Sequence, residues 1–252
     1  MKAMIRALGL FLAGTVLTTG LMAQTAGAGR NDQTIQAKVT EQLAAKREFG
    51  RVQATVEDGI VTLTGSVDLY QQKLDVAKKV RKTAEVQGVR NLIAVEGKNV
   101  ADADLAVQLD RKLYYDRVGY DVAFNYIIAS VENGTATLIG EARSDVARNS
   151  ALALANRMPG VKDVFDDIKV SPTSIFDDQI RLAALRAIYR DPVLNHYAID
   201  PARPIRIVVD NGHVSLYGVV ATQMDKNVAG IRANQVFGTF SVKNNLEVAK
   251  KS

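Results

Sequence analysis

The sequence predicts an α+β protein of three tandem αββαβ domains, each a three-stranded sheet with two helices packed on it. Three observations lead to this fold class. The related stretches DGIVTLTG, NGTATLIG and NGHVSLYG begin at Asp58, Asn133 and Asn211. An apolar stripe with helical spacing precedes each stretch, and a valine follows its second glycine at a constant chain distance. Such periodicity indicates one supersecondary unit per repeat.

Each of these stretches predicts a β-hairpin. Apolar and polar residues alternate before the Asx-Gly pair, as at Val52, Ala54 and Val56, and again after it, as at Val61 and Leu63. A type I′ turn needs two residues that tolerate positive φ, which Asp-Gly and Asn-Gly provide. We therefore expect six glycines to serve backbone geometry: Gly59, Gly65, Gly134, Gly140, Gly212 and Gly218.

Helices are expected before and after each hairpin. The first helix of each repeat shows an apolar residue at every fourth position, which marks one helix face. Its members are Ile35, Val39 and Leu43, then Leu105, Leu109 and Leu113, then Ile180, Ala184 and Ile188. Asp32, Asp102 and Asp177 precede these stripes and are predicted N-caps, because a carboxylate can accept from the free amides of the first turn. The second helices are expected over residues 69–84, 144–158 and 222–236, and each is followed by a third strand.

The predicted organisation is a signal peptide over residues 1–28 and domains over residues 29–98, 99–172 and 173–252. Lys2 and Arg6 form a charged start before an apolar run, and cleavage is expected after Ala23 or Ala28. The alternative is a membrane anchor, but the run is shorter than the ~20 residues of a spanning helix. No later segment is long and apolar enough to span, so we expect no transmembrane segment in the mature chain. This predicts an exported product.

Composition narrows the function classes. The chain has 252 residues, 47% hydrophobic and 23% charged, which is typical of globular proteins. It has no cysteine, and therefore no disulfide, thiolate metal site or lipid-acylation cysteine. The formal charge of +5 includes two cations of the predicted signal peptide, so the balance is mild and a nucleic-acid partner is not expected.

Candidate catalytic and metal sites are lacking in the sequence. The two histidines, His196 and His213, are expected on the surface, one in a loop and one on a strand. They fall short of most transition-metal ligand sets, and neither lies near a nucleophile elbow. We expect no catalytic residue, no metal site and no cofactor, and therefore no enzyme.

The repeat pattern resembles the BON domain of OsmY-like exported proteins. The matching order is Asp-x-x-Ile, then [DN]-G-x-V-x-L-x-G, then G-x-x-x-V-x-[ND]-x-[IL]-x-V, over nearly all of residues 32–250. Departures include Ala136 for the usual valine and Glu85 for glycine. The resemblance implies αββαβ domains, export to the periplasm or cell surface, roles in envelope stress tolerance, and binding of anionic phospholipid or other proteins without catalytic residues. The location expected from it is periplasmic, with secretion possible. Without an acylation cysteine, any membrane contact is expected to be peripheral.

Two sets of residues are candidates for lipid or partner binding. The first set, in the run KKVRK, is Lys78, Lys79, Arg81 and Lys82. Its alternative is a solvated helix end, whereas near anionic headgroups each cation would contribute ~1 kcal/mol. The second set combines tyrosine and arginine, which suit membrane and protein interfaces alike, and its alternative is a helix face with packed tyrosines. Its members are Arg186, Tyr189, Arg190, Tyr197, Arg203 and Arg206.

Aromatic residues concentrate in the second repeat, between its first helix and first strand. They are Tyr114, Tyr115, Tyr120, Phe124 and Tyr126. We expect core and inter-domain packing, with contact to a partner protein as the second interpretation.

The function predicted from the sequence is that of an exported, non-enzymatic binding protein of the cell envelope. It would protect against stress through weak binding of anionic phospholipid surfaces, or of unfolded or partner proteins. The alternative is a structural adaptor in a surface or secretion assembly, and the oligomeric state stays open.

Overall fold

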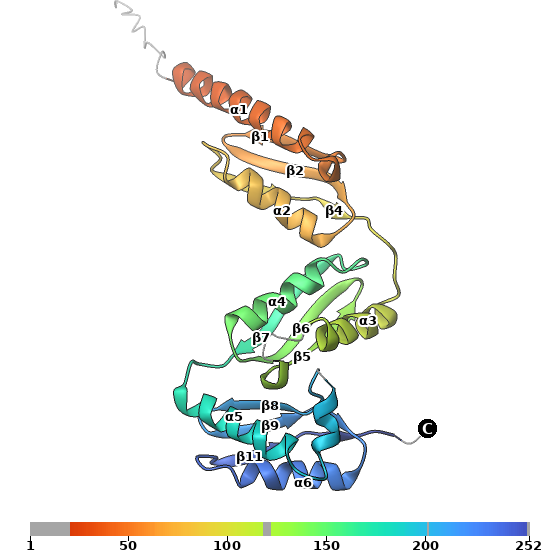
Figure 1. The fold of residues 1–252 in the computed structure, drawn as a ribbon. Helices are drawn as coiled ribbons and strands as arrows, with labels where there is room; N and C mark the ends of the chain where they lie inside the picture. Colours follow the sequence, from red (N-terminus) through yellow and green to blue (C-terminus); the bar gives the residue numbers. More distant parts are fainter. Residues whose placement is uncertain (1–20, 118–121, 201, 251–252) are drawn as a thin grey trace, which may run out of the picture.

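The predicted α+β architecture of three repeated units is confirmed. The computed structural model describes residues 21–117, 122–200 and 202–250, and Figure 1 shows the three units following one another along an elongated molecule. Most of the predicted signal peptide, residues 1–20, lies outside the described residues. Residues 21–28, the rest of the predicted signal peptide, belong to the first helix, which begins at Leu21.

The first repeat contains two helices, a short 3-10 helix and four strand segments. They are α1 (Leu21–Ala44), η1 (Arg47–Phe49), β1 (Val52–Glu57), β2 (Ile60–Val67), α2 (Tyr70–Arg81), β3 (Gly88–Asn91) and β4 (Ala94–Val95). Segments β3 and β4 both pair with β2 in one register, so they act as a single interrupted third strand.

The second repeat follows the same order with an unbroken third strand. Its elements are α3 (Asp102–Tyr115), η2 (Val122–Phe124), β5 (Tyr126–Glu132), β6 (Thr135–Ala142), α4 (Asp145–Asn156) and β7 (Asp163–Val170).

The third repeat carries a longer link between its first helix and its first strand. Its elements are α5 (Ile175–Tyr189), η3 (Asn195–Ile199), β8 (Arg206–Asp210), β9 (His213–Tyr217), β10 (Val219–Val220), α6 (Gln223–Asn234), β11 (Ser241–Asn244) and β12 (Glu247–Val248).

Strand order is the same in every repeat. The strand after the hairpin turn is central, pairs antiparallel with the strand before it, and pairs parallel with the third strand. The orders are β1-β2-β3, β5-β6-β7 and β8-β9-β11. A parallel pair needs a crossover connection, which the second helix of each repeat supplies.

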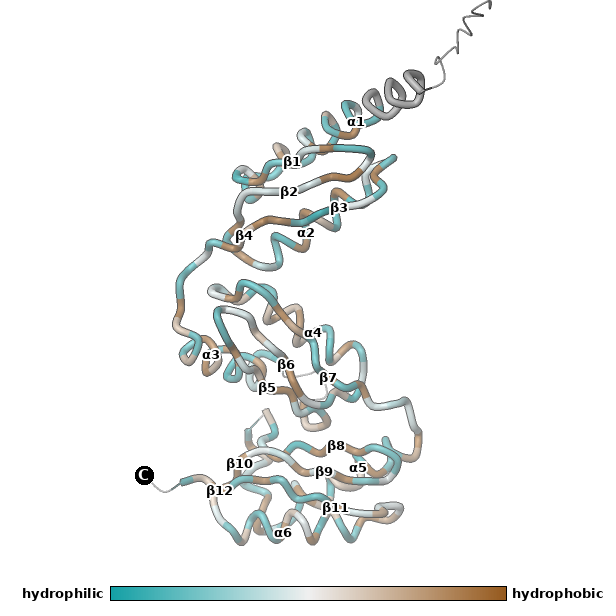
Figure 2. Tube along the Cα trace, turned by 180° about the vertical axis from the view of Figure 1, so that it is seen from behind, coloured by the Kyte–Doolittle hydropathy of each residue, from teal (hydrophilic) through white to brown (hydrophobic). Residues whose placement is uncertain are grey.

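Both helices of a repeat cover one face of its sheet, and Figure 2, seen from behind, shows the opposite face of the sheets. The apolar stripe of each first helix is buried, as the sequence predicts, from Ile35 at 1% exposure to Ile188 at 0%. On the central strands Val61, Leu63 and Leu138 are likewise buried. Each repeat therefore has its own core between helices and sheet.

The prediction that Asp32, Asp102 and Asp177 are helix N-caps is wrong. Asp32 lies inside α1, Asp102 is the first residue of α3 after the N-cap Ala101, and the N-cap of α5 is Ser174. Their carboxylates instead accept hydrogen bonds from the two central amides of the following hairpin turn. The donors are Asp58 and Gly59, then Asn133 and Gly134, then Asn211 and Gly212, at 2.6–3.1 Å.

The hairpin glycines have distinct backbone roles. At each turn both central residues have positive φ, as at Asn211 (49°) and Gly212 (78°), which is the pattern of a type I′ turn. The second glycine of each stretch lies against the strand before the turn. A Cβ at Gly218 would lie 2.0 Å from the carbonyl oxygen of Pro204, and Gly65 and Gly140 have equally close carbonyl neighbours.

Candidate functional site

The predicted basic run ends helix α2. Lys78, Arg81 and Lys82 are exposed, whereas the Lys79 ammonium donates to the carbonyl oxygen of Gln42 at 3.0 Å. That contact ties α2 to the last turns of α1. Three of the four cations are therefore exposed at this end of the first repeat, and one is used within the fold.

The second candidate set does not form one surface. Arg186 and Arg190 are exposed, but Tyr189 is buried at 6% exposure. The Tyr189 hydroxyl donates to the carbonyl oxygen of Ile205 and accepts from its amide, both at 2.9 Å, and burial raises its pKa. The Arg203 guanidinium lies over the Tyr189 ring, 5.1 Å from the centroid.

Tyr197 of this set also serves the fold. Its hydroxyl donates to Asp225 at 2.7 Å and accepts from the Ala221 amide at 2.6 Å. Asp225 accepts in turn from the Thr222 amide at the start of α6. The long link of the third repeat is thereby fastened to its second helix.

Arg206 lies at the junction of the second and third repeats. It is 6% exposed, and its Nη1 donates to the carbonyl oxygen of Val122 in η2 at 2.6 Å. The guanidinium also lies 4.8 Å from the ring centroid of Tyr114 on α3. Burial lowers the Arg206 pKa. Arg206 is thus an inter-domain residue in this structure.

Most of the aromatic residues that concentrate in the second repeat pack between domains, as predicted. The rings of Tyr126 and Tyr217 stack with centroids 4.2 Å apart and an angle of 5°. Phe124 is buried within the core cluster of the third repeat. Tyr115 is exposed instead, at 52%, and Tyr120 lies outside the described residues.

A bidentate ion pair adds to this junction. The Arg143 Nε and Nη2 atoms donate to the two carboxylate oxygens of Asp178 on α5, each at 3.1 Å. The Arg143 guanidinium, donating hydrogen bonds to this carboxylate, lowers the pKa of Asp178. The second and third repeats are therefore joined by an ion pair, a ring stack and a buried arginine.

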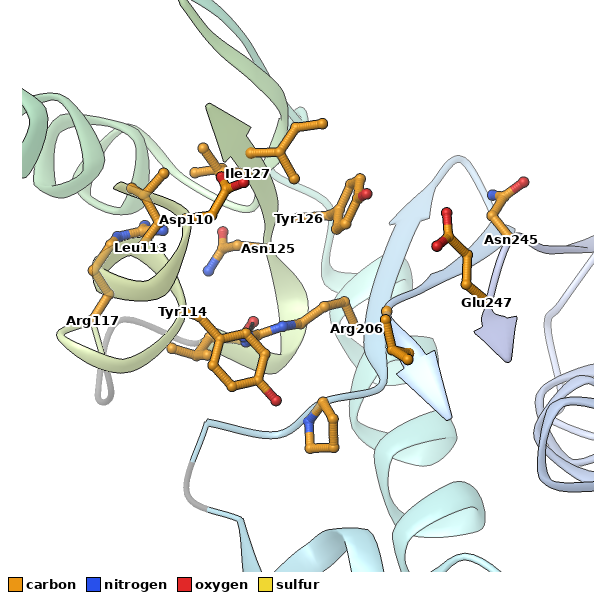
Figure 3. Close-up of a pocket in the computed structure, with 15 residues that line it drawn as sticks. Asp110, Leu113, Tyr114, Arg117, Asn125, Tyr126, Ile127, Arg206, Asn245 and Glu247 are labelled. Carbon is orange, nitrogen blue, oxygen red and sulfur yellow. Dashed lines mark hydrogen bonds between the residues drawn. The ribbon is translucent and has the colours of Figure 1, made fainter. Parts of the chain in front are cut away.

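A cavity of about 400 Å³ lies at the same junction (Figure 3). Asp110 of α3 and Tyr126 of β5 line it from the second repeat, and Asn245 and Glu247 from the third. Figure 3 shows the Tyr126 side chain between the carboxylates of Asp110 and Glu247. Burial, followed by the charges of Glu247 and Asp110, raises the pKa of Tyr126.

The third repeat also has an exposed apolar surface that sequence reasoning missed. Ile175 and Phe176 at the start of α5 are 75% and 79% exposed, and Phe237 and Phe240 before β11 are 99% and 79% exposed. These four residues are called the apolar end. The hairpin turn at Gly212 connects the two segments. The Phe240 ring packs on Gly212, and the amide of Gly212 donates a hydrogen bond to Asp177, the residue that follows Phe176.

Comparison of the three repeats could have indicated the apolar end. The slot that packs against the turn glycine holds Gln87 in the first repeat, Lys162 in the second and Phe240 in the third. Only the third copy places a large apolar side chain there. The signal in the sequence is therefore a difference between the repeats at one aligned position, in addition to the positions at which they agree.

Neither histidine contributes to a metal-binding cluster. His196 and His213 are both exposed, and His213 Nδ1 lies 2.7 Å from the Ser241 hydroxyl. Within residues 21–117, 122–200 and 202–250, no group of three or more His, Cys, Asp or Glu side chains is placed to hold a metal ion.

The family model of the BON domain matches this chain three times, over residues 31–97, 101–172 and 177–250. The chain belongs to the BON domain family. The three repeats are accordingly called BON1, BON2 and BON3.

Two relatives share part of the sequence. An uncharacterised protein in the gshII 5′ region of Anaplasma centrale is 27% identical over 149 residues, which are 58% of this chain and 98% of that protein. The outer membrane lipoprotein DolP of Haemophilus influenzae is 29% identical over 110 residues, or 44% of this chain. This BON protein spans 56% of the length of that lipoprotein.

Solved structures resemble the chain only weakly. The C-terminal domain of CdsD, the structural protein of the Type III secretion system of Chlamydia trachomatis, has a TM-score of 0.25 and 14% identity, covering 80% of this chain and 91% of its own. The periplasmic domain of PrgH from S. typhimurium has a TM-score of 0.19 and 13% identity, with coverages of 84% and 100%.

Proposed function

We propose that this BON protein is an exported, non-enzymatic binding protein of the cell envelope that attaches peripherally to anionic phospholipid surfaces. The observation that carries the proposal is the apolar end of BON3, where three phenylalanines and an isoleucine are 75–99% exposed. Soluble monomers rarely expose contiguous apolar surface without an interaction partner. The periplasmic location and the stress-protective role implied by the family resemblance belong to the same proposal.

A membrane interface suits this end physically. A side chain such as phenylalanine gains ~1.5–3 kcal/mol when it is fully removed from water, and an aromatic ring can enter the headgroup region without a spanning helix. No helix of the described residues is long and apolar enough to cross a bilayer. Attachment through a few inserted rings would be reversible, in keeping with weak binding.

The exposed cations of BON1 supply the preference for anionic lipid in this proposal. Lys78, Arg81 and Lys82 end α2, where ~1 kcal/mol each is expected near an anionic surface. In Figures 1 and 2 the end of α2 and the start of α5 lie on the same side of the molecule. The relative DolP is named an outer membrane lipoprotein, which supports a membrane-associated role for this family member.

Vesicle cosedimentation of the full chain tests the proposal. The vesicles are phosphatidylcholine alone and phosphatidylcholine with phosphatidylglycerol, at low and high salt. The variant takes the residues that BON1 has in the same slots: Phe176→Asn, Phe237→Ala and Phe240→Gln. If each of the three rings contributes ~1.5–3 kcal/mol, the partition coefficient should fall at least about a thousandfold.

The matched control removes exposed apolar groups elsewhere. Val107 and Val146 of BON2 are 70% and 66% exposed, and their replacement by alanine should leave binding unchanged. Charge reversal of Lys78, Arg81 and Lys82 should abolish the preference for phosphatidylglycerol, whereas reversal of Arg186 and Arg190 should not. Absence of binding at low salt, or equal loss in the valine control, contradicts the proposal. Capture of several unrelated unfolded proteins instead would favour a chaperone-like function.

A further inference from the structure

We propose that this BON protein forms a symmetric dimer in which the BON1 domains of two copies dock through the groove between α1 and β1. This groove has a volume of about 390 Å³ and is lined by the last turns of α1, by η1 and by the start of β1. In Figure 1 α2 faces BON2, whereas α1 and β1 lie on the far side of BON1, so BON2 does not cover the groove. The site is remote from the apolar end, and the proposal does not depend on membrane attachment.

BON2 has a corresponding groove, which BON3 covers. Most of the residues that line the BON1 groove recur, at the same places in the repeat, in the BON2 wall of the cavity between BON2 and BON3. Val52 of β1, for example, corresponds to Ile127 of β5. The corresponding pairs on the helix side are Thr40 and Asp110, Leu43 and Leu113, and Ala44 and Tyr114. The chain therefore already contains one such groove in use, and a BON domain is what docks there.

The contact in BON2 indicates which residues of two BON1 domains would meet. Arg206 of BON3 donates from Nη1 to the carbonyl oxygen of Val122 in η2, at 2.6 Å. Counted from the second glycine of each hairpin stretch, Gln53 stands at the position of Arg206, and Arg47 of η1 stands at that of Val122. Gln53 is exposed. We therefore expect the Gln53 side-chain amide of each copy to donate to the Arg47 carbonyl oxygen of the other.

The BON1 groove is open because a small residue replaces a tyrosine. The position of Ala44 is occupied by Tyr114 in BON2 and by Tyr189 in BON3, and an arginine lies over each ring, 4.8 and 5.1 Å from the centroid. In BON3 the long link returns to Tyr189 at Ile205 and closes the groove from within the domain. Ala44 is exposed, and its methyl group leaves room for side chains of a second copy.

The edge strand of BON1 also offers an unused donor in the groove. Ala54 and Ala129 hold the same register in their hairpins, so their amides point to the same side. The Ala129 amide donates to Asp110 Oδ1 at 2.8 Å, but Thr40 replaces this aspartate in BON1. Within the described part of the chain no acceptor lies at the Ala54 amide, whereas the Ala54 carbonyl oxygen accepts from Gln36. A docked copy can supply the missing acceptor.

The docked partner is BON1 of the second copy, because the starts of the other first strands are already in use. Tyr126 at the start of β5 and Arg206 at the start of β8 both lie in the junction of BON2 with BON3. Two BON1 domains present the same surface to each other, and such an isologous contact closes as a two-fold dimer. Exposed charges of both signs, as in the pair of Lys46 and Glu48 beside η1, allow this contact without like-charge repulsion.

Sedimentation velocity of the full chain over a range of concentrations should show a reversible monomer–dimer equilibrium. Ala44→Tyr fills the groove with the residue that BON2 and BON3 have at this position, so the dimer dissociation constant should rise by about thirtyfold or more. Ala103→Tyr, at an exposed position of α3 outside both grooves, is the matched control and should leave the constant unchanged. Gln53→Ala should raise the constant by about threefold to tenfold, because a hydrogen bond between the copies is lost.

The variant of the apolar end distinguishes this contact from association through BON3. Phe176→Asn, Phe237→Ala and Phe240→Gln together should leave the dissociation constant unchanged. A chain that stays monomeric at every concentration overturns the proposal, as does a dimer unaffected by both Ala44→Tyr and Gln53→Ala. Dissociation in the apolar-end variant with persistence in Ala44→Tyr also overturns it. Circular dichroism spectra confirm that each variant is folded.

Discussion

Oδ1 of Asp177 lies 2.8 Å from the backbone nitrogen of Gly212, and its Oδ2 lies 3.1 Å from that of Asn211. One carboxylate at the start of a helix thus binds both central amides of a hairpin turn that comes much later in the chain. Asp32 and Asp102 hold the same place in the other repeats. The aspartate is therefore a tie between helix and hairpin that each BON domain of this chain repeats.

Removal of this tie should loosen the β8–β9 hairpin. Asp177→Ala leaves two turn amides unsatisfied, one of them the buried Gly212 amide, so we expect a loss of about 2 kcal/mol in local stability. Hydrogen exchange of the hairpin should then be about thirtyfold faster, measured on the full chain by mass spectrometry. Asp104→Ala, which removes an exposed carboxylate of α3, should leave the exchange unchanged. Equal exchange in the Asp177 variant and the parent would refute the tie.

A second prediction concerns the second glycine of each hairpin stretch, represented by Gly218. Gly218→Ala forces a Cβ to within 2.0 Å of the Pro204 carbonyl oxygen at a φ of +118°, so we expect a loss of about 3 kcal/mol or more. Gly88→Ala is the matched control, since its Cβ would meet only the Ile60 side chain at 3.8 Å. Urea unfolding of both variants measures the difference. Comparable losses at the two positions would show that the close carbonyl is not the cause.

The third prediction is a pH dependence of docking between BON2 and BON3. Arg143 holds the pKa of Asp178 below its ordinary value of 3.8, so the ionised carboxylate favours the docked state. Its contribution is fully present above pH 3.8 and is lost as the pH falls through the lowered pKa. Asp178→Asn should weaken docking at neutral pH and flatten the change below pH 3.8.

Energy transfer between two dyes measures this docking. Since the chain has no cysteine, Gln108→Cys in BON2 and Lys243→Cys in BON3 provide unique labelling positions that are exposed. The parent and Asp178→Asn should differ most at neutral pH and converge in acid. Identical transfer in both proteins at every pH would show that the ion pair does not hold the domains together.

Local sequence patterns were sufficient to predict the helices and strands of each repeat. The turn at Asn211 and Gly212 needs two residues that tolerate positive φ, and the stripe at Ile180, Ala184 and Ile188 needs one buried helix face. Both requirements involve residues close in the chain. Strand order required the structure, because it depends on which strands lie side by side.

Features that depend on distant residues could not be predicted. Arg206 lies between the buried Ile205 and Ile207 on a strand, so alternation predicts that its side chain points to solvent. In the structure η2 of the preceding domain covers it. Tyr189 was grouped with exposed arginines of α5, but the long link of BON3 returns to it at Ile205. Asp177 is of a residue type favoured at N-caps, and only the position of the hairpin turn shows from which amides it accepts hydrogen bonds.

The parallel ladders have a consequence for how such a chain can be recombined. Val61 faces Val89, Ala136 faces Val164 and Val214 faces Val242, and the chain between the partners has the same length in each case. Every variation in length lies instead between the first helix and the first strand. The segment from the hairpin turn through the third strand is consequently an exchangeable unit. Transplanted from one domain into another, it would keep every residue pair of the parallel strands and would bring its own surface residues to the new position.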